Sequence, residues 1–324
     1  MPTPEQLIHD ARRILILCHA SPDGDAIGSL LAMGAIAQAL GKSATLACSD
    51  SVPKEYRFLP GSREIVQRPT GEFDLVISLD SSDLPRLGQA YDPAKLAGVP
   101  LLNIDHHITN LLFAAANWVD PSSASTSQLV LQFADRLGVG ITPETAACLL
   151  CGIVMDTRGF STPNTDLAAL QAAERLILAG ANLPDIARRV LMQRPFGMVR
   201  VWGQALSQAR LEDSIVWASL PLDQVKRADP SGNGLSGLVA FLAGTEEAKV
   251  AALFTERTGG RVEVSLRSVA GVDVSGVAMA MGGGGHPQAA GFTVAGPLAE
   301  VEDTVLERLR ALLQGEKRAD GREG

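Results

Sequence analysis

The chain has 324 residues, of which 46% are hydrophobic and 20% are charged, with a formal net charge of −8 at pH 7. This length suffices for two ordinary domains with buried cores, and the acidic balance argues against a long duplex DNA partner, because a groove that follows DNA phosphates needs a basic excess. No apolar run approaches the roughly 18 to 20 residues of a membrane span, and the first ten residues are not an apolar leader; we expect a cytoplasmic protein with no membrane partner.

Cysteine usage favours the same compartment. Cys148 and Cys151 form a C-x-x-C spacing, but no second pair completes a zinc site. With Cys18 and Cys48 the thiols are also too few to staple a chain of this length. We therefore expect reduced, partly buried thiols.

Residues 1–184 alternate between short apolar runs and helical segments, which is typical of an α/β domain. The apolar runs predict strands at Arg13–Cys18, Ala44–Cys48, Leu75–Leu79 and Leu101–Ile104. Helical patterns cover Ala26–Leu40, Ser125–Leu137, Pro143–Met155 and Thr165–Leu178. Because the segments between the strands are long enough to cross over, we expect a parallel sheet with helices on both faces.

The second half of the chain predicts a smaller, mixed α/β domain. Residues 185–211 keep a helical pattern and become richer in arginine, as a helical connector between two domains would. In residues 212–314 we expect strands at Ser214–Leu220, Lys249–Glu256 and Arg261–Ser268, and helices at Ser236–Leu242 and Leu298–Leu313. Residues 315–324 are charged and contain glycine, so we expect a disordered tail there.

Residues that bind metals gather where the predicted strands end, which in open α/β sheets is the usual ligand site. Four clusters lie there or at the end of an adjoining helix: His19-x3-Asp23-x-Asp25, Asp80, Asp105-His106-His107, and Asp156. They offer imidazoles and carboxylates but no thiolate, the donor set of Mn²⁺ or a similar ion rather than of structural zinc. They also offer more ligands than one ion needs, and a carboxylate such as Asp80 can bridge two ions about 3.5 to 4 Å apart. Two divalent cations are the expectation.

Each cluster has a structural alternative. An aspartate after a strand often caps the next helix, and Asp25 would suit a helix that begins near Ala26. A pair of adjacent histidines also occurs without any function. Three of the five histidines, however, lie in these clusters, and a fourth, His286, follows four glycines. This coincidence favours the metal site.

The order and spacing of these clusters, ending in Asp156-Thr157, resemble the DHH phosphoesterase superfamily. Val264–Ser268 and the run Gly282–Gly291, which reads G-G-G-G-H-P-Q-A-A-G, look like the associated DHHA1 domain. The compact two-domain layout is similar to the branch that contains nanoRNases and phosphatases of 3′-phosphoadenosine 5′-phosphate (pAp). Arg158 departs from the pattern, because many relatives carry glycine after the Asp-Thr pair, and this bears on substrate choice rather than on metal binding.

The resemblance also implies a role for each residue. One metal would be held by His19, Asp23 and Asp80, and the other by Asp25, Asp80, His106 and Asp156. Asp80 would bridge the two ions, and Asp105 would orient a ligating imidazole from behind. His107 would be free to act on the scissile phosphate or the leaving oxygen, so the expected catalytic residues are His107 and Asp80.

The glycine run lacks the lysine and hydroxyl residue of a P-loop and does not form the dinucleotide fingerprint. A plain flexible turn is one interpretation. The other is a backbone that a phosphate can approach closely because no Cβ intervenes, next to charged donors. On the second interpretation, the expected substrate-binding residues are Arg267, Gly283, Gly284, Gly285 and His286.

The leading hypothesis is a two-metal enzyme that hydrolyses very short oligonucleotides to nucleoside 5′-monophosphates and pAp to AMP and phosphate. Its partners would be short oligonucleotides and small phosphorylated nucleotides, and a homodimer is compatible with the sequence. The alternative is a phosphodiesterase of cyclic or linear dinucleotides in signalling. An inorganic pyrophosphatase is disfavoured, because that branch carries a different C-terminal domain. A nucleotide sensor without activity is disfavoured because the ligand set is intact.

Overall fold

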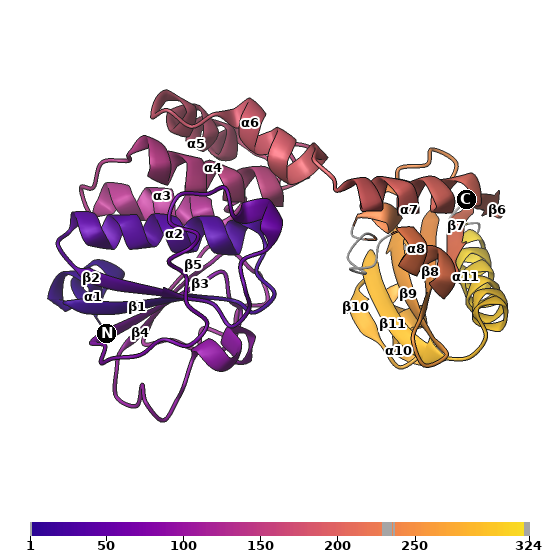
Figure 1. Cartoon of the computed structure of the whole chain (residues 1–324), viewed down its shortest axis with the longest axis horizontal. Coiled ribbons are helices and arrows are strands. Elements are labelled where there is room, and N and C mark those ends of the chain that lie inside the picture. Colours follow the sequence, from indigo (N-terminus) through magenta and orange to yellow (C-terminus); the bar gives the residue numbers. More distant parts are fainter. Residues whose placement is uncertain (1, 229–234, 236, 321–324) are drawn as a thin grey trace. The chain divides into compact units, whose positions relative to one another are not determined.

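The computed structural model describes residues 2–228, 235 and 237–320. Contacts within the chain divide it into two compact units, Met1–Gln193 and Arg194–Gly324, which Figure 1 traces from indigo to yellow. The division falls within the segment 185–211 that we predicted as a connector.

The described part of the first unit contains a five-stranded parallel sheet in the order β2-β1-β3-β4-β5. Its strands are β1 (Arg13–Cys18), β2 (Ser43–Ala47), β3 (Leu75–Leu79), β4 (Leu101–Asp105) and β5 (Ala116–Val119). The central strands are buried on both faces, which explains their continuous apolar sequence. The predicted parallel α/β fold is confirmed.

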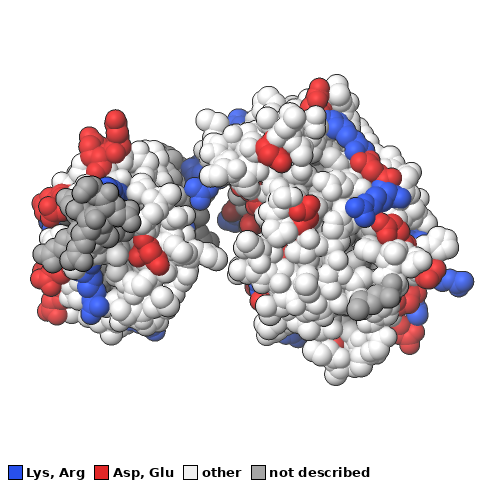
Figure 2. Space-filling view, turned by 180° about the vertical axis from the view of Figure 1, so that it is seen from behind, with Lys and Arg blue, Asp and Glu red and all other residues white. Residues whose placement is uncertain are grey.

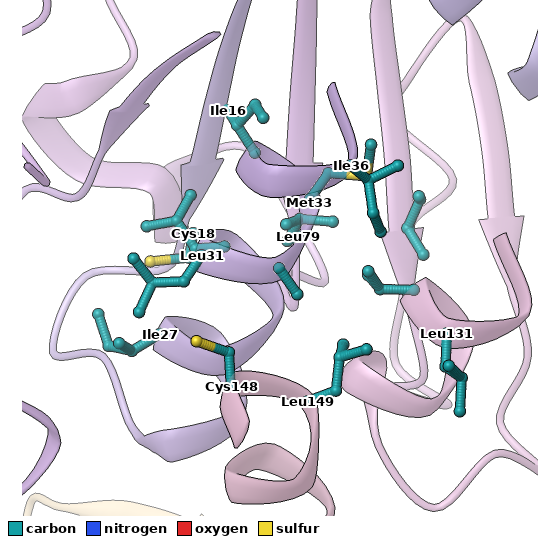
Figure 3. Packing of buried hydrophobic residues seen from close by; sticks show 14 of the residues in the cluster. Ile16, Cys18, Ile27, Leu31, Met33, Ile36, Leu79, Leu131, Cys148 and Leu149 are labelled. Atoms are coloured by element: carbon teal, nitrogen blue, oxygen red, sulfur yellow. The ribbon is translucent and has the colours of Figure 1, made fainter. Parts of the chain in front are cut away.

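One face of this sheet is covered by helices α2 (Gly24–Ala39) and α3 (Thr126–Arg136), and α4 (Pro143–Asp156) packs on these two helices, as Figure 1 shows. Apolar residues from all three meet those of the sheet in one core, and Figure 3 shows Ile27 of α2, Leu131 of α3 and Leu149 of α4 within it. The unit also contains α1 (Pro4–Asp10), the 3₁₀ helix η1 (Lys54–Tyr56), α5 (Leu167–Leu178), α6 (Leu183–Ala187) and the π-helical turn η3 (Arg188–Met192).

We also expected α-helices on the opposite face of the sheet, but a 3₁₀ helix and a loop cover it. A second core there joins strand residues such as Leu17 and Val76 to Leu87 of the 3₁₀ helix η2 (Pro85–Ala90) and to Leu96 in the following loop. Prolines 85, 93 and 100 and glycines 88 and 98 interrupt the crossover from β3 to β4. These residues disfavour an α-helix, so short turns take its place.

The predicted connector is not one continuous helix. Ile186 of α6 and Val190 of η3 belong to the core of the first unit, whereas Val201 of α7 (Phe196–Ser207) belongs to a core of the second. The break falls at Arg194-Pro195, because the residue before a proline is pushed out of the helical conformation.

The described part of the second unit contains a six-stranded mixed sheet in the order β10-β11-β9-β8-β7-β6, in which β7 and β8 are parallel and the other pairs antiparallel. Its strands are β6 (Arg210–Glu212), β7 (Ile215–Leu220), β8 (Val250–Arg257), β9 (Arg261–Ser268), β10 (Gly284–His286) and β11 (Ala289–Ala295). Helices α7, α8 (Leu222–Ala228) and α9 (Leu238–Leu242) supply residues to the core on one face, and α10 (Ser275–Ala280) and α11 (Leu298–Asp320) to the core on the other.

Helix α11 reaches further than expected. It continues to Asp320, six residues into the segment 315–324 that we predicted as a disordered tail; residues 321–324 lie outside the described part of the chain. One exposed glycine costs a helix only about 1 kcal/mol, and the residues after Gly315 include good helix formers such as glutamate and lysine.

Within the described residues, we find no helix with the length and apolar character needed to cross a membrane. The four cysteines are buried free thiols.

Candidate metal centre

The candidate ligands meet at the carboxyl edge of the first sheet. His19 follows β1, Asp80 follows β3, and Asp105 is the last residue of β4. Parallel strands end at the same edge, so residues far apart in the sequence come together there. Asp80 adopts a left-handed backbone conformation with φ of +58°, which aspartate tolerates better than most residues.

The first group of potential ligands consists of His19, Asp23 and Asp80, whose ligand atoms lie within 4.8 Å of one another. His19 Nε2 is 3.4 Å from Asp80 Oδ2 and 3.9 Å from Asp23 Oδ1. His19 Nδ1 donates to the carbonyl of Ala20 at 2.8 Å. A carbonyl oxygen can only accept, so the neutral ring carries its proton on Nδ1 and presents the lone pair of Nε2 to the carboxylates.

The second group consists of Asp25, His106 and Asp156, also within 4.8 Å. His106 Nε2 lies 3.1 Å from Asp156 Oδ2 and 3.7 Å from Asp80 Oδ1, while its Nδ1 faces the carbonyl of Ser123 at 3.3 Å. Asp80 thus lies beside both groups, with Oδ2 towards His19 and Oδ1 towards His106. This is the arrangement that a bridging carboxylate requires.

Asp23, not Asp25, caps helix α2. Asp23 Oδ1 accepts from the backbone N–H groups of Asp25 and Ala26, both at 3.0 Å. Asp25 lies in the first turn and is fully buried. The alternative that Asp25 serves only as a helix cap is therefore excluded by the geometry.

Small residues at the contact of α2 with α4 bring Asp25 close to Asp156. A Cβ added to Gly28 would lie 2.4 Å from the carbonyl oxygen of Cys148, and one added to Gly152 would lie 2.3 Å from Asp25 Oδ1. Only hydrogen fits at these positions, so the backbones approach more closely than side chains would allow.

The pKa values of the aspartates show that burial and mutual repulsion disfavour the charged form of Asp25 and Asp156. Burial and the neighbouring Asp156 and Asp80 raise the pKa of Asp25 well above its ordinary value. Burial also raises the pKa of Asp156 to about 6, against the hydrogen bond from His106. For Asp80, burial would raise the pKa, but the hydrogen bond from His19 and the charges of the imidazoles outweigh it and lower the pKa to about 2.

Both imidazoles respond to these carboxylates. Burial, the largest single influence, would lower their pKa values, but Asp80 raises the pKa of His19 to about 9, and Asp156 with Asp25 raises that of His106 to about 10. The site therefore favours positive charge where the two rings meet the carboxylates. The donors present, carboxylate oxygens and imidazole nitrogens, fit divalent cations of the Mn²⁺ type.

His107 and Asp105 form a pair beside the two groups. His107 Nδ1 lies 2.7 Å from Asp105 Oδ1, and Asn110 Nδ2 donates to Asp105 Oδ2 at 2.6 Å. We expected Asp105 to orient a ligating imidazole; it accepts from the backbone N–H of His106, at 2.9 Å, and holds the ring of His107, which together with Asp80 and His106 forms a third group of potential ligands. His107 also lies near the ligands, with Nδ1 3.6 Å from Asp80 Oδ1.

The predicted substrate-binding residues lie in the second unit, apart in sequence from every candidate ligand. Arg267 of β9 pairs with Ala289 of β11, which pairs with His286 of β10. Directly paired residues point to the same face, so Arg267 and His286 flank Ala289 at about two strand spacings, roughly 10 Å. Arg267 Nη1 donates to the carbonyl of Leu266 at 2.9 Å.

The glycines before His286 differ in whether the structure leaves room for a side chain. A Cβ on Gly283 would lie 2.2 Å from the carbonyl oxygen of Gly291, and one on Gly285 would lie 2.4 Å from that of Ala289. Gly285 also has φ of +143°. A Cβ on Gly284, by contrast, meets no heavy atom within 4 Å in the described chain. Gly283 and Gly285 thus serve the packing of the strands, whereas Gly284, like Gly282 before it, has open space where a Cβ would lie.

The sequence did not predict that residues 123–127, at the start of α3, contact the ligands. Ser123, Ser125, Thr126 and Ser127 are all buried. Thr126 and Ser127 donate their backbone N–H groups to Asp25. The run of hydroxyl residues before an apolar helix was visible as a helix start, but nothing in the sequence shows that it faces aspartates of other elements.

The fold and the cluster at the strand ends define the class of protein. The family model of the DHH family, N-terminal domain, matches residues 13–153, and the model of the DHHA1 domain matches residues 215–315. The chain belongs to the DHH family of metal-dependent phosphoesterases, in the form that carries a DHHA1 domain, so the resemblance is confirmed.

Particular relatives are similar over nearly the whole chain. The "Bifunctional oligoribonuclease and PAP phosphatase NrnA" of Thermus thermophilus is 36% identical over 308 residues, which is 92% of this chain and 89% of that protein. The Bacillus subtilis protein of the same name is 26% identical over 285 residues, 87% and 89% of the two chains. A solved structure, that of an exopolyphosphatase-related protein from Bacteroides fragilis, matches with a TM-score of 0.87 at 26% identity over 95% of each chain.

Proposed function

We propose that this chain hydrolyses very short oligonucleotides to nucleoside 5′-monophosphates and pAp to AMP and phosphate. The observation that carries the proposal is the buried Asp80, whose two carboxylate oxygens face His19 of the first ligand group and His106 of the second. The names of the Thermus thermophilus and Bacillus subtilis relatives, both oligoribonucleases and PAP phosphatases, support the choice of substrate.

In this proposal, one cation is held by His19, Asp23 and Asp80, and the other by Asp25, Asp80, His106 and Asp156. Two such cations lower the pKa of an attacking water and offset the charge that develops on the phosphate. Manganese suits the donor set, and a probable manganese-dependent inorganic pyrophosphatase of Streptococcus agalactiae is 27% identical over 192 residues. That likeness covers only 55% of this chain.

The chain's own residues complete the reaction. Asp105 fixes the imidazole of His107 through Nδ1, which leaves Nε2 to meet the leaving oxygen. In the second unit, Arg267 and His286 offer donors for a further phosphate of the substrate, beside the open backbone of Gly284. Both proposed reactions break a bond to a nucleotide 3′-oxygen, so one arrangement serves both.

Short substrates also agree with the surface charge. On the face drawn in Figure 2, basic and acidic side chains are interspersed among the described residues rather than gathered in a continuous basic track. Long nucleic acids are held mainly through their phosphates. The net charge of −8 also offers no basic excess for a long duplex, so duplex DNA is not among the proposed partners.

A product assay in Mn²⁺ tests the proposal by comparing a labelled RNA dimer, an RNA 24-mer, cyclic di-AMP and pAp. We expect rapid loss of the dimer and of pAp with an unchanged 24-mer. Cyclic di-AMP cleaved faster than the dimer would replace the proposal with its alternative, a dinucleotide phosphodiesterase of signalling. No turnover of any of the four substrates would reject both.

A further inference from the structure

Helix α3 begins against the candidate metal centre, and its first residue touches ligands of both groups. The backbone N–H of Thr126 donates to Asp25 Oδ2 at 2.6 Å, and that of Ser127 donates to Asp25 Oδ1 at 2.9 Å. The hydroxyl Oγ1 of Thr126 donates to Asp80 Oδ1 at 3.0 Å. One fully buried residue thus holds two aspartates that lie 101 and 46 residues away in the sequence.

The hydroxyl of Thr126 is not needed to begin the helix. Ser125 is the N-cap of α3, and its Oγ accepts the backbone N–H of Gln128 at 3.1 Å. The capping function of a hydroxyl at the helix start is therefore already filled by Ser125. The bond from Thr126 to Asp80 has no role in the backbone of α3.

The bond to Asp80 has consequences for how that carboxylate is oriented. Asp80 Oδ1 faces His106 Nε2 at 3.7 Å, and Oδ2 faces His19 Nε2 at 3.4 Å. A rotation of the carboxylate would move both oxygens away from these rings. A hydroxyl that donates to Oδ1 opposes this rotation and still leaves a lone pair of that oxygen for a cation.

The contacts to Asp25 also fix its position. The backbone N–H groups of Thr126 and Ser127 donate one to each carboxylate oxygen, so the start of α3 holds the carboxylate of Asp25 in one orientation.

We propose that Thr126 is a positioning residue for the metal centre, fixing the bridging Asp80 through its hydroxyl while its backbone N–H holds Asp25. This inference deepens the proposed function and rests on its ligand assignment, but not on its substrate. Thr126 touches neither substrate nor reacting atoms; it acts through the two aspartates.

The decisive pair of variants separates the hydroxyl from the rest of the side chain. Thr126→Val keeps the shape and both backbone contacts and removes only the donor to Asp80. Thr126→Ser keeps the donor and removes a methyl group. The matched control is Thr145→Val, a buried threonine in the first turn of α4 whose hydroxyl faces Thr142 Oγ1 at 3.2 Å. Thr145 lies eleven residues before Asp156 in α4, about 16 Å along the helix.

The main measurement is the affinity of the metal-free protein for Mn²⁺ by calorimetry, with no substrate present. Loss of an outer partner of a ligand typically lowers metal affinity by about 10- to 100-fold, and we expect this loss for Thr126→Val. Thr126→Ser should keep most of the affinity, and Thr145→Val all of it. The melting temperature of each metal-free variant is measured alongside, and Thr126→Ala is used in place of Thr126→Val if the valine variant does not fold.

Two results overturn the proposal: wild-type affinity in the folded variant that lacks the hydroxyl, or an equal loss of affinity in Thr126→Ser. The second would assign Thr126 to packing, through its methyl group. Because the readout is metal binding, failure of the wild-type enzyme to cleave pAp or the RNA dimer would reject the proposed substrates without touching this inference.

Discussion

The imidazole of His107 is held by the carboxylate of Asp105, with 2.7 Å between Nδ1 and Oδ1. The neighbouring ring of His106 turns the other way, with Nδ1 towards the carbonyl of Ser123 and Nε2 towards Asp156. Adjacent histidines therefore have different partners, and under the proposed function we expect them to have different tasks.

This difference predicts that the two alanine variants fail in different ways. His106→Ala should lose one Mn²⁺ ion per chain, because its Nε2 belongs to the second ligand group. His107→Ala should keep both ions and lose most of its kcat, by the factor of about 10² to 10⁴ that a general acid or base contributes. Metal analysis after gel filtration, together with kcat on pAp, measures both effects. Equal metal contents in the two variants would refute the assignment.

Asp105 shows why part of this site is beyond sequence reasoning. Its position at the end of a strand was predictable from the apolar run Leu101–Ile104 and from the rule that parallel strands end at one edge. Which of the two following imidazoles it contacts depends on side-chain rotamers and on Asn110, which approaches from the next loop. The sequence therefore predicts the cluster but not its internal hydrogen bonds.

Thr126 and β5 illustrate two other limits. The contacts of Thr126 join it to residues 101 and 46 positions away, and no local pattern encodes such distances. Strand β5 reads Ala-Asn-Trp-Val, too short and too polar for a buried strand, because it lies at the edge of the sheet. The central strands were predictable because burial on both faces demands continuous apolar residues.

Close packing at Gly152 should make this position intolerant of even one methyl group. The added Cβ of Gly152→Ala would lie 2.1 Å from Ser127 Oγ and 2.3 Å from Asp25 Oδ1. Overpacking of this kind costs about 1 to 3 kcal/mol, and we expect a lower melting temperature together with weaker Mn²⁺ binding. Thermal unfolding of the metal-free protein and calorimetric titration with Mn²⁺ measure the two effects.

The control for Gly152 is another helical glycine. Gly203→Ala in α7 adds a Cβ that meets no heavy atom within 4 Å among the described residues. It should leave Mn²⁺ binding unchanged and stabilise the protein by up to about 1 kcal/mol. A Gly152→Ala protein with the stability and metal affinity of the wild type would show that α2 and α4 can separate without disturbing Asp25.

Metal binding should release protons at neutral pH. In the metal-free protein, burial would lower the pKa values of His19 and His106, but the carboxylates around them raise these values to about 9 and about 10. Both rings are then protonated at pH 7, whereas a cation binds only the neutral imidazole. The apparent affinity for Mn²⁺ should therefore increase as the pH rises from 7 through 9, and decrease further below pH 6 as Asp156 becomes protonated.

Calorimetry in two buffers with different ionisation enthalpies measures this release. We expect about one proton per bound ion at pH 7, falling towards zero above pH 10. A binding enthalpy independent of the buffer at pH 7 would mean that the imidazoles are already neutral or do not bind the ions.

The last prediction concerns Arg267, which lies in the second unit on the same face of its sheet as His286. A charge-assisted hydrogen bond from a guanidinium to phosphate is typically worth about 1.5 to 3 kcal/mol, so Arg267→Ala should lower kcat/KM for pAp roughly ten- to a hundredfold. Metal content should not change. The loss should shrink for bis-p-nitrophenyl phosphate, which has one phosphate for the metal centre and no second phosphate for the second unit to hold. Arg261→Ala is the matched control, because Arg261 lies on the same strand and the same face, six residues away, and is exposed. If Arg267→Ala slowed the artificial ester as much as pAp, Arg267 would belong to the chemical step or to folding, and the proposal that the second unit grips the substrate would be wrong.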